Sequence, residues 1–380
     1  MSIDNQECSR CVLSSSDDPD IFFNKNGICN HCLGYELKVN ELPKSHKEKL
    51  SYIEKKIDEI KKHGKGREYD CILGLSGGVD SSYLSLITKE YGLRPLLVHF
   101  DNGWNSELAV NNIDHIVSRL GFNLYTYVVN WNEFKDLQLS YIKSGVLDWE
   151  IPTDHGFYAM MYHQAHKRKI KYILSGHNLV TEGILPKCMR WSKLDVANIS
   201  DIHSKFGTKK LKTFPTLPFY KSIYFSKILK IELVSPLNYF EYDKNKAKQA
   251  IIEKLGWRDY GGKHYESIFT RFYQGYVLVE KYGFDKRKAH LSTLINSGQI
   301  SKEDAIKQLR KPDYNFKQIN DDKEYVLKKL GLTELEFEKI MNENPVNHLN
   351  FKSYETGIYR KHEKFMKKIK PITRILKKIV

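Results

Sequence analysis

Residues 72–82 read Ile72-Leu73-Gly74-Leu75-Ser76-Gly77-Gly78-Val79-Asp80-Ser81-Ser82 and join a short apolar run to an amphipathic segment. This order predicts a buried strand, a glycine-rich turn and the first turn of a helix. Glycine lets backbone N–H groups approach a polyphosphate, the helix N-terminus adds partial positive charge, and the serine hydroxyls add donors. A plain tight turn is the alternative, but the complete string favours a phosphate loop. No lysine follows the glycines, which disfavours Walker-type chemistry at a γ-phosphate.

The segments around this loop alternate between strand-like and helix-like patterns. Strand-like runs cover 70–76, 94–100, 123–129 and 170–176, and helical patterns cover 82–91 and 106–120. Such alternation predicts an α/β fold with a parallel sheet covered on both faces. After Pro236 the patterns are helical, at 245–255, 265–282, 286–296, 302–310 and 334–342. We therefore predict three parts: 1–62 with a connecting helix, 63–236 with the phosphate loop, and a helical region at 237–380.

Composition narrows the class of protein. The chain has 380 residues, of which 41% are hydrophobic and 28% are charged, so wholesale disorder is excluded. The formal net charge of +15 favours anionic ligands without saying which. The sequence shows neither a secretory leader nor a long apolar run, and we expect a cytoplasmic protein.

Two Cys-x-x-Cys pairs lie near the N-terminus, at Cys8, Cys11, Cys29 and Cys32. We predict that they bind one structural zinc ion, because four thiolates complete a tetrahedral shell and leave no position open for chemistry. An iron–sulfur cluster and four unrelated reduced cysteines are the alternatives. His31 lies between the last two cysteines and is expected to be a neighbour rather than a fifth ligand.

The string from Ser76 to Ser82 resembles the PP-loop of the ATP pyrophosphatase superfamily, which includes GMP synthetase, asparagine synthetase and the tRNA thiolases. The resemblance implies a HUP-like parallel-sheet core, Mg-ATP bound over the loop, and cleavage between the α- and β-phosphates to adenylylate a carbonyl oxygen. ATP, Mg²⁺ and Zn²⁺ are thus the expected cofactors. The residues expected to contact the nucleotide are Ser76, Gly77, Gly78, Val79, Asp80, Ser81, Ser82, Phe100, Asp101, Gly176 and His177.

Longer strings are similar to the bacterial N-acetyl sugar amidotransferases of lipopolysaccharide, capsule and flagellar sugar pathways. They are FDNGWNSEL at 100–108, TEGILP at 181–186, GGKHYES at 261–267, TRFYQ at 270–274 and GFDKRKAHL at 283–291. This resemblance spans nearly the whole chain up to about Arg310. It implies conversion of an acetamido group on a sugar into an acetamidino group, in O-antigen or related surface polysaccharide biosynthesis.

The chemistry of that conversion suggests roles for individual residues. An amide carbon resists ammonia until its oxygen becomes a leaving group, and transfer of AMP to the oxygen achieves this. Lys263 or Arg271 would neutralise charge as the phosphates separate, with a solvated basic face as the alternative. Asp80 is a candidate for magnesium or nucleotide contact, with helix capping as its alternative. The sugar pocket is assigned to Trp104, Asn105, Thr181 and Glu182; for Trp104, packing in the core is the alternative.

The expected partners follow from the same chemistry. The acceptor is an N-acetylated sugar, free or nucleotide-linked. Neither Ser2 nor the contexts of Cys71 and Cys188 fit a glutaminase nucleophile, so we expect a separate glutaminase subunit, with or without a cyclase-like partner, to supply ammonia. Nucleic acid is not expected. The basic amphipathic tail from Arg360 predicts peripheral contact with anionic lipid, or else a helix packed on its own protein.

Two other functions remain open at this point. An RNA-modifying thiolase-like enzyme would need reactive cysteines, and only Cys71, in a predicted strand, and Cys188 are available. A nucleotide-binding scaffold without turnover is the third possibility. His155, His163 and His166 suggest a second metal site, but ordinary packed histidines explain them better.

Overall fold

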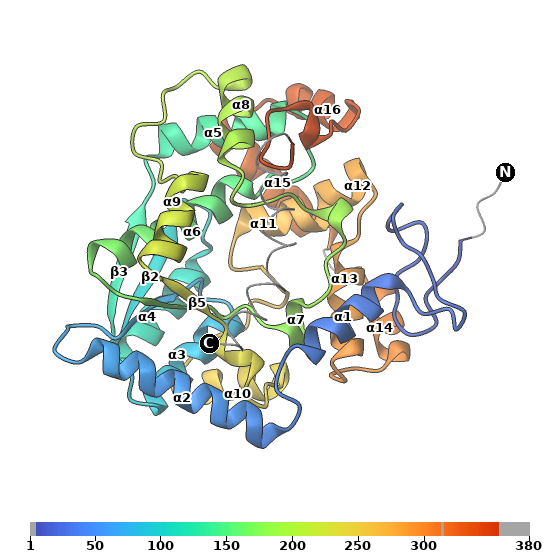
Figure 1. The fold of residues 1–380 in the computed structure, drawn as a ribbon. Helices are drawn as coiled ribbons and strands as arrows, with labels where there is room; N and C mark the ends of the chain where they lie inside the picture. Colours follow the sequence, from blue (N-terminus) through green and yellow to red (C-terminus); the bar gives the residue numbers. More distant parts are fainter. Residues whose placement is uncertain (1–4, 313–314, 357–380) are drawn as a thin grey trace.

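The computed structural model describes residues 5–312 and 315–356. Its centre is a five-stranded parallel sheet in the order β3-β2-β1-β4-β5 (Figure 1). The strands are β1 (Cys71–Gly74), β2 (Pro95–Asp101), β3 (Asn123–Val128), β4 (Tyr172–Leu174) and β5 (Glu232–Val234). The first four confirm the predicted strands. β5 was not predicted, because it is a three-residue edge strand with only one buried residue.

Alternate residues of β1 to β4 enter two separate hydrophobic cores, as expected for a sheet covered on both faces. Ile72 belongs to one core and Leu73 to the other. The core with Leu73 is closed by α2 (His46–Gly64), α3 (Val79–Glu90), α4 (Glu107–Leu120) and α10 (Lys244–Leu255). The core with Ile72 is closed by α5 (Trp131–Lys143), α6 (Ile151–Lys167) and α8 (Val196–Phe206), together with C-terminal helices.

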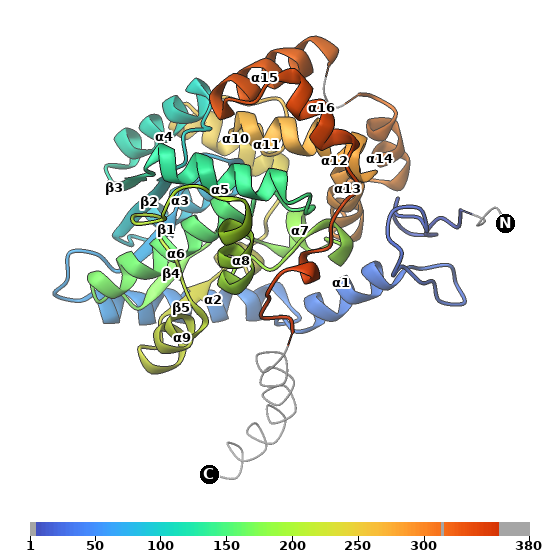
Figure 2. The ribbon, with the colours of Figure 1, turned by 90° about the horizontal axis from the view of Figure 1, so that it is seen from above.

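The C-terminal region is helical, as predicted. It contains α11 (Ile268–Phe272), a π-helical turn (Tyr273–Val277), α12 (Leu278–Tyr282), α13 (Lys286–Asn296), α14 (Lys302–Leu309), α15 (Phe316–Leu330) and α16 (Glu334–Asn342). α15 and α16 lie near α11 and α12, as Figures 1 and 2 both show. A β-bridge between Asn105, which follows β2, and Ser267, directly before α11, places this region beside the carboxyl end of β2, where ligands of open α/β folds bind.

Two further helices lie near the N-terminal cysteines and the end of β4. α1 (Asn30–Asn40) follows the cysteine pairs, and α7 (Leu179–Glu182) follows β4. A helix α9 (Phe219–Ile223), extended by a π-helical turn (Tyr224–Ile228), precedes β5. No helix within the described ranges is long and apolar enough to cross a membrane. The predicted basic tail at 360–380 falls outside the described residues.

Candidate active site and metal centre

The glycine-rich loop connects β1 to α3 as predicted. Gly77 has φ of +85°, a conformation that favours glycine, and the Gly78 N–H donates to Ser76 Oγ at 3.3 Å. The Gly77 carbonyl accepts from Trp257 Nε1 at 2.8 Å and from the Tyr260 hydroxyl at 3.0 Å. Two aromatic side chains from the C-terminal region thus hold the turn in place.

The start of α3 is suited to an anion. No side chain of the described chain caps this helix, so its first backbone N–H groups are available to a phosphate. The serine hydroxyls were predicted to act as donors to a phosphate, but two of them donate to the backbone of the loop itself. Ser82 is fully buried and donates to Gly78 O at 2.7 Å, and Ser81 donates to the same carbonyl at 3.2 Å. Ser82 therefore stabilises the turn, and its contact with the nucleotide stays a prediction.

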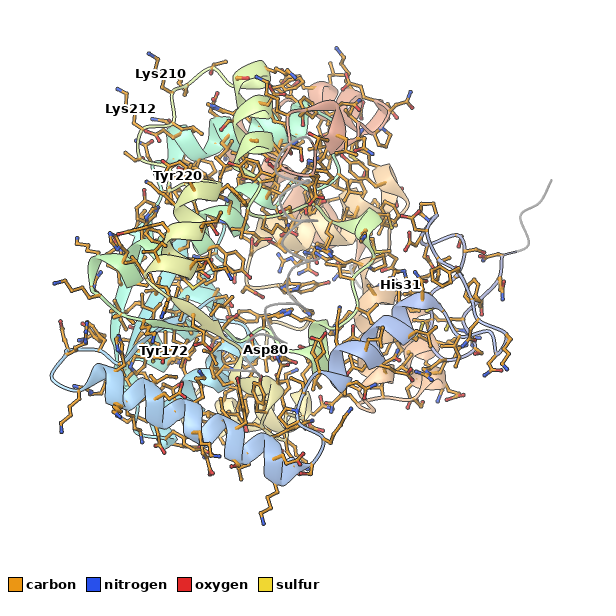
Figure 3. All side chains as sticks on the ribbon, in the orientation of Figure 1. His31, Asp80, Tyr172, Lys210, Lys212 and Tyr220 are labelled. Atoms are coloured by element: carbon orange, nitrogen blue, oxygen red, sulfur yellow. The ribbon has the colours of Figure 1, made fainter. Side chains whose placement is uncertain are left out.

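Asp80 lies in the first turn of α3, and Figure 3 shows it near the middle of the molecule. Its carboxylate accepts hydrogen bonds from Thr181 Oγ1, at 3.2 Å, and from the Tyr242 hydroxyl. Burial and the negative charge of Glu182 raise the pKa of Asp80, while Lys263 opposes the shift. Asp80 is therefore part of a shared polar cluster and does not cap the helix.

Glu182 links the end of β4 to the C-terminal region. One carboxylate oxygen lies 2.5 Å from His177 Nδ1, and the other lies 3.3 Å from Lys263 Nζ. Burial acts to raise the pKa of Glu182, but the charges of Lys263 and His177 hold it well below its usual range. The sequence placed these three residues in three different roles, and the structure brings them together.

Two further basic residues at this cluster were not predicted. His290 Nδ1 donates to the Thr181 carbonyl at 3.1 Å, and its Nε2 lies 3.4 Å from Lys244 Nζ. Burial, followed by the charges of Lys263 and Lys244, holds the pKa of His290 well below its usual value. The string at 283–291 contains His290, but nothing in the sequence placed Lys244 or Tyr242 beside the loop.

Gly176 brings β4 against the loop. A Cβ atom built on Gly176 would lie 2.9 Å from Ser81 N and 3.0 Å from the Asp80 carbonyl carbon. Only glycine allows this approach without displacing backbone. Gly176 therefore lies beside the loop through direct contact between their backbones.

The end of β2 carries another part of the predicted site. Asp101 Oδ1 accepts the Gly103 N–H at 2.9 Å, and Asn105 Nδ2 lies 3.0 Å from His99 Nε2. Asn105 also forms an antiparallel bridge with Ser267, which ties this edge to the C-terminal region.

Three predicted site residues have structural partners of their own. Trp104 is fully buried and donates from Nε1 to Gln138 at 2.7 Å, so core packing describes it. The Phe100 ring is buried and stacks on Tyr127, leaving only its backbone for a nucleotide. Arg271 pairs with Asp322 through two hydrogen bonds of 2.6 and 2.7 Å and its side chain is only 15% exposed, so a solvated basic face does not describe it.

Cys71, Cys188 and His155 are placed among other groups of the protein. Burial raises the pKa of Cys71 strongly and that of Cys188 to about 12, so neither is a thiolate at neutral pH. His155 donates from Nδ1 to Lys193 O at 2.8 Å and accepts the Leu217 N–H at Nε2. The prediction of an ordinary packed histidine is thus confirmed at this position.

The four paired cysteines converge on one point. All four Sγ atoms lie within 4.8 Å of one another, with 3.9 Å between Cys8 and Cys32 and 3.7 Å between Cys11 and Cys29. A zinc ion with Zn–S bonds of about 2.3 Å requires sulfur atoms roughly 3.8 Å apart, so these thiolates fit a tetrahedral metal. His31 instead pairs with Asp18 at 2.6 Å and stays outside the cluster, as predicted.

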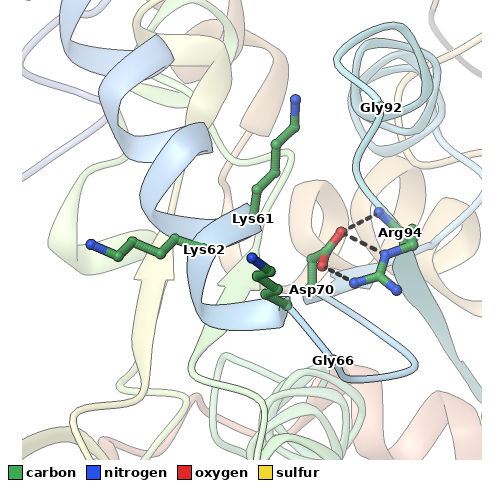
Figure 4. Close-up of a pocket in the computed structure, with 7 residues that line it drawn as sticks. Lys61, Lys62, Gly66, Asp70, Gly92 and Arg94 are labelled. Carbon is green, nitrogen blue, oxygen red and sulfur yellow. Dashed lines mark hydrogen bonds and ion pairs between the residues drawn. The ribbon is translucent and has the colours of Figure 1, made fainter.

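A hollow of about 610 Å³ lies at the opposite end of the sheet (Figure 4). It is lined by lysines at the end of α2 and by Arg94, which pairs with Asp70 at 2.6 Å. Asp70 and Arg94 precede β1 and β2, so this hollow faces away from the glycine-rich loop.

Comparison with known proteins adds relatives of two kinds. The chain is 27% identical over 317 residues to an uncharacterized protein of Methanocaldococcus jannaschii, covering 80% of this chain and 94% of that one. A shorter match, 38% identical over 71 residues, joins 18% of this chain to 22% of tRNA(Ile)-lysidine synthase from Chlamydia pneumoniae.

Similar solved structures include two synthetases. The NH3-dependent NAD synthetase from Campylobacter jejuni covers 75% of this chain and 97% of its own, at 13% identity and a TM-score of 0.30. The NMN synthetase from Francisella tularensis covers 61% and 93%, at 14% identity and a TM-score of 0.29.

A family model matches the C-terminal part of the chain, from residue 266 to residue 370. The model describes the C-terminal domain of LPS biosynthesis proteins like WbpG. The match includes α11 to α16 and so covers the helices that pack over the site. It agrees with the resemblance to lipopolysaccharide sugar enzymes drawn from the strings above. Over residues 266–370 the chain is thus similar to the WbpG-like lipopolysaccharide biosynthesis C-terminal domains.

Proposed function

We propose that this chain is an ATP-dependent amidotransferase of lipopolysaccharide biosynthesis, which converts an acetamido group on a sugar into an acetamidino group. The observation that carries the proposal is the loop at 75–78, which leads into an uncapped helix N-terminus beside Asp80 and Lys263. This arrangement suits a polyphosphate. The family match at 266–370 supports the pathway.

The first step activates the acceptor. The triphosphate of ATP lies on the N–H groups of α3, with Lys263 and Lys244 facing the departing pyrophosphate. The acetamido oxygen attacks the α-phosphorus, the bond to pyrophosphate breaks, and a cationic O-adenylyl imidate forms. Asp80 and Asp101 would hold Mg²⁺, which neutralises phosphate charge when bound.

The second step introduces nitrogen. His177, oriented by Glu182, accepts a proton from an ammonium ion at Nε2. Ammonia then adds to the imidate carbon, the carbon–oxygen bond to AMP breaks, one proton of the added nitrogen passes to solvent, and an amidinium remains. The ammonia comes from a separate glutaminase, because the raised pKa values of Cys71 and Cys188 leave this chain no thiolate outside the metal cluster.

Pyrophosphate release from ATP tests the proposal. The purified protein, ammonium and a panel of N-acetylated sugars, free and nucleotide-linked, are assayed together. Release that depends on one sugar, with a product in which mass spectrometry shows NH in place of the acetamido oxygen, is the expected result. Release that depends on tRNA and on no sugar would establish the RNA-modifying alternative instead.

A further inference from the structure

The cysteine module, which comprises residues 5–40 with the two cysteine pairs and α1, packs directly against α7. The buried cysteines, Leu13 and Tyr35 form one hydrophobic cluster with Ile184, which follows α7 in the chain. A Cβ atom on Gly183 would lie 2.5 Å from Tyr35 Cε2, so the tyrosine ring rests on the backbone of this segment. Lys38 Nζ donates to the Gly183 carbonyl at 2.6 Å. Two residues of α1 therefore hold the end of α7 from outside.

The preceding residues of the same short segment contact the glycine-rich loop. Thr181 Oγ1 donates to Asp80 at 3.2 Å, and Glu182 pairs with His177 and with Lys263. Thr181 and Glu182 lie within three residues of Gly183 and Ile184 in the chain. A shift of the outer contacts would thus move the polar cluster at the loop.

Helix α13 joins both sides. Its residues His290, Thr293 and Asn296 recur at helical spacing and lie on one face. His290 donates to Thr181 O at 3.1 Å, Thr293 Oγ1 accepts the Ile184 N–H at 3.0 Å, and Asn296 Nδ2 donates to Cys32 Sγ at 3.1 Å. Figure 1 shows α1, α7 and α13 side by side, in agreement with their contacts.

We propose that the cysteine module is a positioning element for α7: metal bound by the four thiolates fixes α1, and Tyr35 and Lys38 then hold Thr181 and Glu182 against the loop. The physical reason is that a module this small has little core apart from its thiolates, so it orders only with its metal. α7 has four residues and gains its own order from these contacts. The coupling between the cysteine module and α7 is inferred from the contacts alone. Only its effect on the reaction with ATP depends on the proposed function.

Hydrogen–deuterium exchange of the full chain tests this coupling without any substrate. Lys38→Met removes the bond to Gly183 and leaves the thiolates intact, and Leu37→Ala, at an exposed position of the same helix, is the matched control. We expect Lys38→Met to keep its metal and to speed exchange at 179–186 about tenfold, since a charged hydrogen bond is lost. Leu37→Ala should leave that exchange unchanged. Equal exchange in both variants would overturn the proposal.

Metal removal and Tyr35 give a second, independent measurement. Chelation should speed exchange at 179–186 before it affects β2, and Tyr35→Ala should do the same. Tyr35→Phe keeps the ring and loses only the hydroxyl contact with Ser297, so it should have a smaller effect than Tyr35→Ala. Unchanged protection of 179–186 after metal loss would refute the coupling. If chelation also speeds exchange in β2, metal loss has destabilised the sheet as well. The comparison of Lys38→Met with Leu37→Ala then tests the coupling. A protein that shows the coupling but releases no pyrophosphate would refute only the proposed function.

Discussion

His177 Nδ1 lies 2.5 Å from a carboxylate oxygen of Glu182, at the carboxyl end of β4. A carboxylate that binds one imidazole nitrogen orients the ring and leaves the second nitrogen to exchange protons. Within the described residues, Nε2 of His177 has no hydrogen-bond partner, and the side chain is 53% exposed.

His177→Gln should separate the two steps of the reaction. We expect sugar-dependent pyrophosphate release to persist, while amidine formation from ammonium at neutral pH falls about 10²-fold, the usual range for loss of a general base. Hydroxylamine is largely neutral at this pH and needs no base, so it should restore product formation. Equal losses with ammonium and hydroxylamine would contradict the role of His177.

Gly176→Ala should weaken ATP binding, because a Cβ would lie 2.9 Å from Ser81 N. Overpacking against backbone should cost roughly 1–3 kcal/mol, which corresponds to about fivefold to a hundredfold in the dissociation constant. Gly34→Ala is the matched control, since nothing lies within 4 Å of a Cβ at that position. Calorimetric titration with ATP measures both, and equal affinities would argue against close contact between β4 and the loop.

The metal content of the protein should be one zinc per chain. Cys29→Ser should lose the metal and lower the melting temperature, because the remaining thiolates no longer complete the shell. Cys188→Ser is the control, because Cys188 lies outside the cluster. Elemental analysis decides the matter: iron with visible absorption would indicate an iron–sulfur cluster, and no metal at all would reject the site.

Stability should decline in mild acid because of two buried histidines. Burial lowers the pKa of His155 and of His348 from 6.5 to about 4. The unfolded chain binds protons more readily, so each neutral imidazole contributes fully above pH 6.5 and loses its contribution between pH 6.5 and 4, up to roughly 3 kcal/mol.

Urea unfolding at pH 7 and pH 5 measures this effect. His348→Gln should reduce the difference in stability between the two pH values, although it weakens the contact with Asn198 at both. His46→Gln, at a half-exposed side chain, should leave the difference as in wild type. An unchanged pH dependence in His348→Gln would show that other groups cause the acid sensitivity.

The nitrogen source gives a further test. The purified chain should use ammonium salts at raised pH, where more ammonia is neutral, and should use glutamine only when a glutaminase is added. Efficient glutamine-dependent amidine formation by the chain alone would mean that it contains a second active site.

The sequence was sufficient for the features that depend on local pattern. Apolar runs of strand length, the glycine turn before α3 and the cysteine spacing depend on neighbours a few residues apart, and the structure confirms each. The edge strand β5 was missed because three residues, of which only Val234 is buried, carry little pattern.

Tertiary structure determines which residues form the site. Tyr242, Lys244 and His290 reach Asp80 and Thr181 from segments more than 60 residues away, and no local spacing encodes that meeting. Trp104 and Arg271 show the reverse: their residue types suit a binding site, but packing gives one to the core and pairs the other with Asp322. A sequence determines what chemistry each side chain offers, whereas burial and partners brought by the fold determine whether that chemistry is used.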